Sequence, residues 1–224
     1  TRDAGRYEAV MRAIADGKHT VKEIALSARL THSDLTPYLK RLRALQLIER
    51  RAPALLQPRQ RESSTRGRYH LSHAYLRFWY RFVEPNLEAI EQGLAEAVWQ
   101  NITEQFNSFV GVGAFEELCR AWVRLKAQQG QLPFSPEHVG SEWNVKAQVD
   151  VVAVNFRHKQ VLLGECKWTQ NKVDVAIVRE LTTQKASLVL PENWQCYFAF
   201  FSRSGFTDDA KQEINRIGAI AVTL

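Results

Sequence analysis

The sequence of 224 residues predicts an α/β domain, in which helices flank a mixed β-sheet, preceded by a winged helix-turn-helix domain. Two observations predict this fold class. Three amphipathic helical patterns occupy the first 45 residues, and short Val-rich runs alternate with helical patterns after residue 142. We expect the winged helix-turn-helix domain at 1–72, a helical connector at 73–103 and the α/β domain at 104–224.

The composition excludes several classes of protein. With 45% hydrophobic and 24% charged residues, the chain is neither disordered nor of low complexity. Its apolar runs are far shorter than the roughly 20 residues of a membrane span, and no signal peptide opens it, so we expect a soluble cytoplasmic protein. Cys119, Cys166 and Cys196 follow no zinc or disulfide pattern. Because the sequence begins at Thr1 rather than Met, we expect it to be part of a longer protein.

Two helices open the first domain. Apolar residues at helical spacing between Tyr7 and Ile14 form the first, and the run Asp-Gly-Lys at 16–18 ends it. Thr20 and Glu23 have the spacing of a capping box, which predicts the start of a second helix.

A third helix and a two-stranded wing complete this domain. Apolar residues recur from Leu35 to Leu45, and Pro37 is compatible with a helix because it falls in the first turn. The apolar pair at 47–48 and the segment 67–71 are predicted as strands joined by a polar loop.

Basic residues concentrate in this region. Eleven Lys and Arg residues stand against two Glu residues between positions 40 and 81, a net charge of +9 compared with +6 for the whole chain. Affinity for nucleic acid comes largely from the counterions that such residues release. A winged helix with arginines on its third helix and wing is suited to DNA backbone contact, although a solvated surface or a dimerisation module are the alternatives. The predicted DNA-binding residues of this domain are Lys40, Arg41, Arg43, Arg66 and Arg68.

The connector is dense in aromatic residues between 75 and 82. Two roles are open for them, stacking on bases and burial against neighbouring elements. A helix is predicted to Phe109, and we expect a break at 111–113, Gly-Val-Gly, before another helix begins at Ala114.

A β-hairpin follows in the second domain. Strands are predicted at 142–145, 148–156 and 161–168. If the hairpin turn is centred between Arg157 and His158, residues whose numbers add to 315 face each other.

This register places Asp150 opposite Glu165, with Lys167 on the same face and Cys166 on the other. Two carboxylates about 5 Å apart repel by roughly 3 kcal/mol at an effective dielectric of about 20. Mg²⁺ or Mn²⁺ relieves this conflict, with Asp150, Glu165 and the Cys166 backbone carbonyl as ligands. Lys167 would orient or help deprotonate a metal-bound water. The alternative is a strand face on which Lys167 neutralises one acid.

These residues carry a family resemblance. Val149-Asp150 followed by Glu165-Cys166-Lys167 resembles the D…(D/E)xK signature of the restriction-endonuclease-like nucleases. That family often takes another glutamate from a preceding helix, and Glu116 in the run Gly-Ala-Phe-Glu-Glu-Leu at 113–118 matches it. The resemblance implies a nuclease-like α/β core. It also implies the catalytic set Glu116, Asp150, Glu165 and Lys167.

A closer resemblance covers nearly the whole chain. The runs Gly-Glu-Cys-Lys-Trp at 164–168 and Arg-Phe-Trp-Tyr-Arg-Phe-Val at 77–83, together with the predicted winged helix, resemble the carboxyl-terminal region of archaeal-type AAA+ family ATPases. This implies an amino-terminal ATPase domain that is absent here, since the chain holds no GxxxxGK[ST] sequence.

The remaining elements suit an α/β sheet. We predict a helix at 173–188, a strand at 195–201, a helix at 208–217 and a last strand at 219–224. Lys185, on the first of these helices, is predicted to contact DNA phosphate, with an ordinary surface lysine as the alternative.

Three functions therefore compete. The first is a Mg²⁺-dependent DNA endonuclease module that a winged helix targets and an ATPase accompanies. The second keeps the nuclease fold without catalysis, as a DNA-binding or regulatory module of that ATPase. The third is a transcriptional regulator that acts through the winged helix, which gives no reason for the paired carboxylates.

Overall fold

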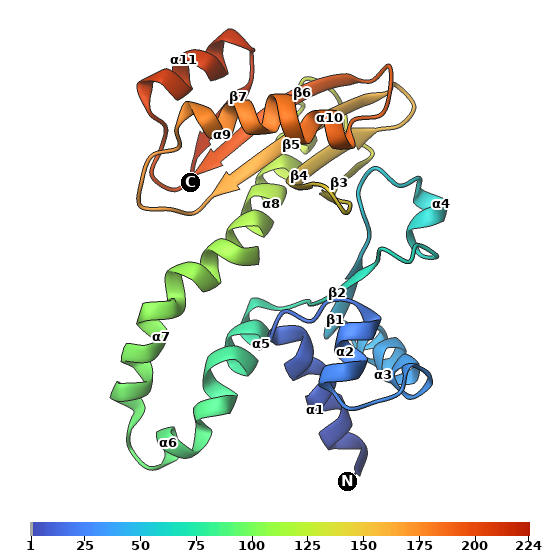
Figure 1. Ribbon diagram of the computed structural model, residues 1–224, viewed down its shortest axis with the longest axis vertical. Coiled ribbons are helices and arrows are strands. Elements are labelled where there is room, and N and C mark those ends of the chain that lie inside the picture. The colour runs from blue at the N-terminus through green and yellow to red at the C-terminus, as the bar shows by residue number, and fades with distance from the viewer. Residues whose placement is uncertain (1) are drawn as a thin grey trace. The chain divides into compact units, whose positions relative to one another are not determined.

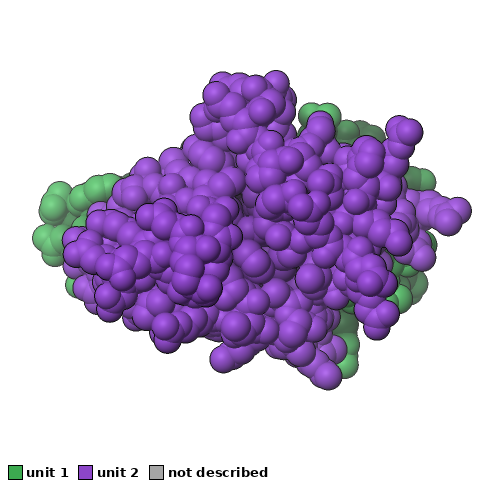
Figure 2. Space-filling view, turned by 90° about the horizontal axis from the view of Figure 1, so that it is seen from above, with its two compact units in different colours: residues 1–52, 61–105 green, residues 53–60, 106–224 purple. Residues whose placement is uncertain are grey.

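The computed structural model describes residues 2–224, which divide into two compact units (Figures 1 and 2). The first unit comprises residues 1–52 and 61–105, and the second comprises 53–60 and 106–224. Two backbone contacts hold the segment 53–60 in the second unit: the Ala54 amide donates to the Ser141 carbonyl at 2.9 Å, and the Leu55 amide donates to the Glu142 carboxylate at 2.8 Å. Residues 53–60, which fall within the first domain expected at 1–72, therefore pack in the second unit.

Three helices form the core of the first unit: α1 (Arg2–Ala15), α2 (Val21–Ser27) and α3 (His32–Ala44). The predicted capping box is confirmed, because the Thr20 hydroxyl accepts from the Glu23 amide at 3.3 Å and the Glu23 carboxylate accepts from the Thr20 amide at 2.9 Å. The predicted apolar stripes are buried together. Their buried members include Val10, Ile14, Ile24, Leu35, Leu39 and Leu42.

The two predicted strands pair antiparallel. β1 (Ile48–Arg51) lies beside β2 (Arg68–Leu71), with Ile48 opposite Leu71. Ile48, Tyr69 and Leu71 are buried in the core of the three helices. A short helix, α4 (Pro58–Arg61), interrupts the loop between the strands and was not predicted.

The aromatic connector is helical but irregular. Phe82 is 3% exposed, and Leu76 and Tyr80 pack against the core of the first unit, so part of the aromatic run serves burial. The segments are α5 (Ala74–Phe78), the π-helical η1 (Trp79–Val83), the 3₁₀-helical η2 (Glu84–Asn86), α6 (Leu87–Glu91) and α7 (Ala95–Phe109).

The break predicted at 111–113 is wrong. A π-helical turn, η3 (Val110–Ala114), carries the chain from α7 directly into α8 (Phe115–Gln128). Gly113 has a φ of 105°, which glycine tolerates, so the distortion is local. Gly111 has a packing reason, since a Cβ there would lie 3.3 Å from the Trp168 side chain. Among residues 2–224, no helix is long and apolar enough to cross a membrane.

The second unit contains a mixed five-stranded sheet in the order β3-β4-β5-β6-β7. β3, β4 and β5 are antiparallel neighbours, whereas β6 runs parallel to both β5 and β7. The α/β class and the predicted strands are confirmed, although β3 begins four residues before its predicted start. The strands are β3 (His138–Trp143), β4 (Gln148–Asn155), β5 (Gln160–Lys167), β6 (Gln195–Ser202) and β7 (Ile220–Thr223).

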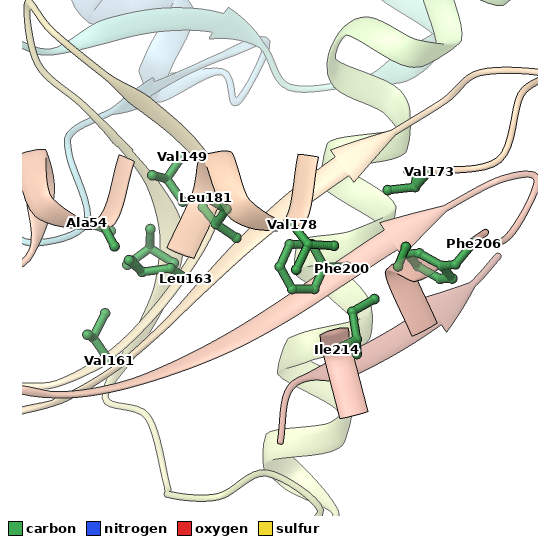
Figure 3. Packing of buried hydrophobic residues seen from close by; sticks show 13 residues of the cluster. Ala54, Val149, Val161, Leu163, Val173, Val178, Leu181, Phe200, Phe206 and Ile214 are labelled. Carbon is green, nitrogen blue, oxygen red and sulfur yellow. The ribbon is translucent and has the colours of Figure 1, made fainter. Parts of the chain in front are cut away.

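Helices cover both faces of this sheet. α8 buries Phe115, Cys119 and Val123 on one face, against Leu162 and Phe201 among others. The other face carries α9 (Val175–Arg179), the π-helical η4 (Glu180–Lys185), α10 (Ala186–Val189) and α11 (Asp208–Arg216). Figure 3 shows this second core, where the helical Val178, Leu181 and Ile214 meet the strand residues Leu163 and Phe200.

The register of the β4–β5 hairpin is the predicted one. Its pairs run from Val151 opposite Gly164 to Asn155 opposite Gln160, and each pair adds to 315. The turn is fixed by the Asn155 side chain, whose carbonyl oxygen accepts from the His158 amide at 2.8 Å. The β3–β4 ladder, in contrast, shifts register between Gly140 and Glu142.

Candidate functional site

The candidate site lies where the β4–β5 ladder ends. Val151 and Gly164 form the last pair, so Asp150 and Glu165 each stand one residue beyond it. The register shift of the β3–β4 ladder falls on the same stretch of β4, between Val149 and Val152. The Asp150 carboxylate turns toward β5 and accepts a hydrogen bond from the Cys166 amide at 3.0 Å.

Glu165 is held by two lysines. Its side chain is 4% exposed, and its carboxylate accepts a hydrogen bond from Lys167 Nζ at 2.8 Å. Lys185 Nζ donates to both carboxylate oxygens, at 2.9 Å to Oε1 and 2.8 Å to Oε2. Two ammonium groups therefore share one buried carboxylate.

The structure places Lys185 in this cluster rather than on an open surface. It ends the π-helical turn η4 and lies 3.6 Å from the Glu180 carboxylate as well. The sequence contained a signal for this position: Val178, Leu181 and Lys185 have the spacing i, i+3, i+7 of one helix face, and the first two are fully buried. Lys185 therefore differs from the ordinary surface lysine that was the alternative to a DNA contact, because its ammonium group is paired with a buried carboxylate.

Glu116 reaches the cluster from α8 through a buried arginine. Arg120 is 2% exposed, and its guanidinium donates to Glu116 at 3.4 Å and to Glu117 at 3.1 Å. Its Nη1 also donates to the Asp150 main-chain carbonyl at 2.8 Å. Arg120 was not predicted, although two glutamates three and four residues before an arginine are a spacing that favours ion pairs on a helix.

The electrostatics of the cluster are unfavourable for Asp150. Burial, together with the negative charges of Glu165 and Glu116, raises its pKa to about 7. For Lys167, burial lowers the pKa, but the hydrogen bond and charge of Glu165 outweigh it and raise the pKa overall. The pKa of the Cys166 thiol is raised mainly by a hydrogen bond with Cys119 and, to a lesser extent, by burial. The thiol therefore stays protonated where it packs against α8.

The donor chemistry fits a hard divalent cation, but the geometry is closed. Within residues 2–224, no group of three or more His, Cys, Asp or Glu side chains is placed to hold a metal ion. Asp150 and Glu165 nevertheless supply the oxygens that Mg²⁺ and Mn²⁺ prefer. In an extended strand the N–H and C=O of one residue point to the same neighbouring strand, so the Cys166 carbonyl faces the side on which Asp150 lies. An ion at Glu165 would have to displace a lysine.

The predicted DNA-binding residues of the first unit differ in their surroundings. Lys40 and Arg41 on α3 and Arg66 in the loop before β2 are exposed. Arg43 donates two hydrogen bonds to Glu62, at 2.6 and 3.2 Å, so part of its charge is compensated. Arg68 is half-buried, and burial lowers its pKa.

The chain is similar to several known proteins. Its residues 79–180 match the DUF234 family, described as archaeal and bacterial proteins of unknown function. An uncharacterized protein of Methanocaldococcus jannaschii is 31% identical over 198 residues, which are 88% of this chain and 44% of the relative, so the chain spans less than half of that protein's length.

Two solved structures share limited similarity. A repair endonuclease from Pyrococcus abyssi has a TM-score of 0.33 and 19% identity, covering 46% of this chain and 45% of its own. The O-methyltransferase NcsB1 of neocarzinostatin biosynthesis has a TM-score of 0.22 and 15% identity, covering 99% of this chain and 65% of its own. At these TM-scores neither structure carries a function over to this chain. What the comparisons show is a likeness, over residues 79–180, to a family of unknown function.

Proposed function

We propose that the second unit is a metal-dependent nuclease module with a nuclease-like fold, and that the first unit is a winged helix-turn-helix domain that holds it on DNA. The observation that carries this proposal is the convergence of Asp150, Glu165 and Lys167 at the end of one hairpin, with Glu116 linked to the same point. This combination of paired acids and a lysine suits the hydrolysis of a phosphodiester.

The cost of placing Asp150 here supports a functional role. A carboxyl group whose pKa is raised to about 7 by burial and by two acidic neighbours is a poor choice for stability alone. Val149, Val151 and Val152 of the same strand are fully buried, so Asp150 is a carboxylate within an apolar stretch of β4. A bound cation would supply the missing compensation.

The chain would divide the reaction among its residues. Asp150, Glu165 and the Cys166 carbonyl would hold Mg²⁺ or Mn²⁺, which supplies a water of lowered pKa and charge stabilisation at phosphorus. Lys167 would direct its ammonium toward the attacking water or a phosphate oxygen, and Glu116 would accept a proton or a water hydrogen bond. Water would attack phosphorus and give up a proton to Glu116 while the bond to the leaving oxygen breaks, and that oxygen would take up a proton from solvent water. Arg120 fixes the Asp150 backbone meanwhile.

The order of elements in the first unit supports a DNA-binding role. Three packed helices and an antiparallel pair of strands follow the order of a winged helix-turn-helix. The third helix, α3, presents Lys40 and Arg41 to solvent, which would let it contact phosphates. We expect little sequence preference and a steep dependence on salt, because the contacts would be mostly ionic.

A cleavage assay tests the proposal. Supercoiled, linear, branched and single-stranded DNA are incubated with the full chain in Mg²⁺, Mn²⁺ or EDTA. We expect metal-dependent cleavage of at least one form, lost in Glu165→Gln and Lys167→Met while DNA binding persists. Glu192→Gln, on an exposed residue of the same unit, is the matched control and should cleave like the parent.

A second function is favoured by one observation. Both oxygens of Glu165 already receive lysine hydrogen bonds, as in a closed structural cluster. A non-catalytic DNA-binding or regulatory module would show DNA binding without cleavage of any form, and that outcome would replace the nuclease. Partnership with an ATPase domain rests on sequence resemblance and stays a prediction.

A further inference from the structure

Lys185 makes the most extensive contact with the Glu165 carboxylate. Its Nζ lies 2.9 Å from Oε1 and 2.8 Å from Oε2, whereas Lys167 contacts Oε1 alone at 2.8 Å. A cation that bridges both oxygens occupies the position from which a metal ion would bind that carboxylate. The D…ExK pattern does not include this lysine.

We propose that Lys185 is a resident cation that closes Glu165 in the metal-free protein, gives way to a divalent ion, and then binds a non-bridging oxygen of the DNA phosphodiester. The inference rests on the proposed nuclease function and adds a phosphate-binding residue to it. In this scheme, metal binding and DNA binding are coupled through Lys185.

Lys185 is better placed to move than Lys167. Lys167 is two residues from Glu165 on the same strand, so their side chains share one face. Lys185 comes instead from the π-helical turn η4, a rare conformation found often at functional sites. It also has a second acidic partner, because Glu180 lies 3.6 Å away with 42% of its side chain exposed.

The charges at the site give the exchange a reason. Glu165 carries one negative charge and contacts two ammonium groups, while Arg120 pairs with Glu116. A divalent ion beside both lysines adds positive charge, which a phosphodiester anion would offset. Metal and DNA should therefore strengthen each other's binding, since such coupling is reciprocal.

A purely structural lysine predicts different behaviour. If Lys185 only ties η4 to β5, its removal lowers stability and leaves the coupling between metal and DNA unchanged. Removal of either lysine raises cation affinity through charge alone. The informative quantities are therefore the difference in Mn²⁺ affinity between the two lysine variants and the change in each affinity when DNA is added.

The experiment titrates the full chain with Mn²⁺ and follows free Mn²⁺ by electron paramagnetic resonance, with and without a short DNA duplex. In the parent, DNA should tighten Mn²⁺ binding by roughly fivefold or more. Lys185→Met should bind Mn²⁺ more tightly than Lys167→Met in the absence of DNA and lose the tightening by DNA. Lys185→Arg keeps the charge and the fold, and its forked guanidinium should hold both oxygens and weaken Mn²⁺ binding.

The outcomes separate the two levels of the proposal. Mn²⁺ affinity that is equal in Lys185→Met and Lys167→Met, with DNA coupling retained in Lys185→Met, would overturn the role of Lys185 and leave the nuclease standing. Absence of Mn²⁺ binding in the parent and in all three variants would overturn both.

Discussion

Arg120 donates a hydrogen bond from Nη1 to the main-chain carbonyl of Asp150 at 2.8 Å. The same guanidinium contacts Glu116 and Glu117 and is 2% exposed. It therefore ties the first turn of α8 to the point at which the β4–β5 ladder ends. Because this buried guanidinium is always charged and donates to three acceptors, it fixes the position of Asp150 relative to α8.

Replacement of Arg120 by Met should lower the free energy of unfolding by about 3 kcal/mol or more, because it leaves acceptors and a carboxylate without their buried partner. Urea unfolding at neutral pH measures the change. Arg124→Met is the matched control: Arg124 contacts Glu117 at 3.1 Å but is 44% exposed, so its loss should cost less than about 1 kcal/mol. If both substitutions lowered the free energy of unfolding equally, burial of Arg120 would add nothing to its contribution to stability.

Asp150 should make stability fall as pH rises. Its pKa of about 7 in the folded protein exceeds its ordinary value of 3.8, so between these values the folded state holds a proton that the unfolded chain releases. The free energy of unfolding then decreases with pH in this window, by at most about 1.4 kcal/mol per pH unit. Above pH 7 the contribution is constant.

Asp150→Asn removes this titration and can still accept from the Cys166 amide. The variant should gain stability over the parent as pH rises from 5 to 8, measured by urea unfolding at each pH. A difference between parent and variant that stays constant over this range would contradict the raised pKa.

The hairpin could be predicted because its signals are local. Alternation with a period of two fixes which side chains share a face, and a short turn with Asn155 fixes the register. Asp150 and Glu165 could thus be placed at the same end of the hairpin from sequence alone, although the ladder ends at Val151 and Gly164, one pair before them. The apolar stripes of α1 and α3 were equally local.

The missed features depend on contacts between distant segments. Arg120 reaches the Asp150 carbonyl across 30 residues, and Lys185 reaches Glu165 across 20. The π-helical turns η3 and η4 have no simple sequence signature, so glycines at 111 and 113 read as a break when they mark a distortion and a close approach. The segment 53–60 belongs to the second unit through hydrogen bonds with 141–142.

The capping box of α2 should contribute measurably to the first unit. Thr20→Ala removes the hydroxyl that accepts from the Glu23 amide, at an expected cost of about 0.5–2 kcal/mol in the free energy of unfolding. Thr65→Ala, at an exposed loop position, is the control and should stay within about 0.5 kcal/mol of the parent. A Thr20 variant as stable as the control would mean that α2 is held by its packing alone.

The ion pair between Arg43 and Glu62 should restrain DNA binding. The two hydrogen bonds of this pair, at 2.6 and 3.2 Å, use guanidinium N–H groups of Arg43. These groups could otherwise donate hydrogen bonds to a DNA phosphate. Glu62→Gln should therefore tighten binding to a random duplex severalfold at low salt, and should steepen the dependence of log K on log salt by about one phosphate contact. Fluorescence anisotropy over a range of salt concentrations measures both quantities. Because Glu62→Gln also removes a negative charge, the comparison is repeated in an Arg43→Ala background, where the gain should disappear. A gain of the same size in both backgrounds would assign the effect to general charge rather than to Arg43.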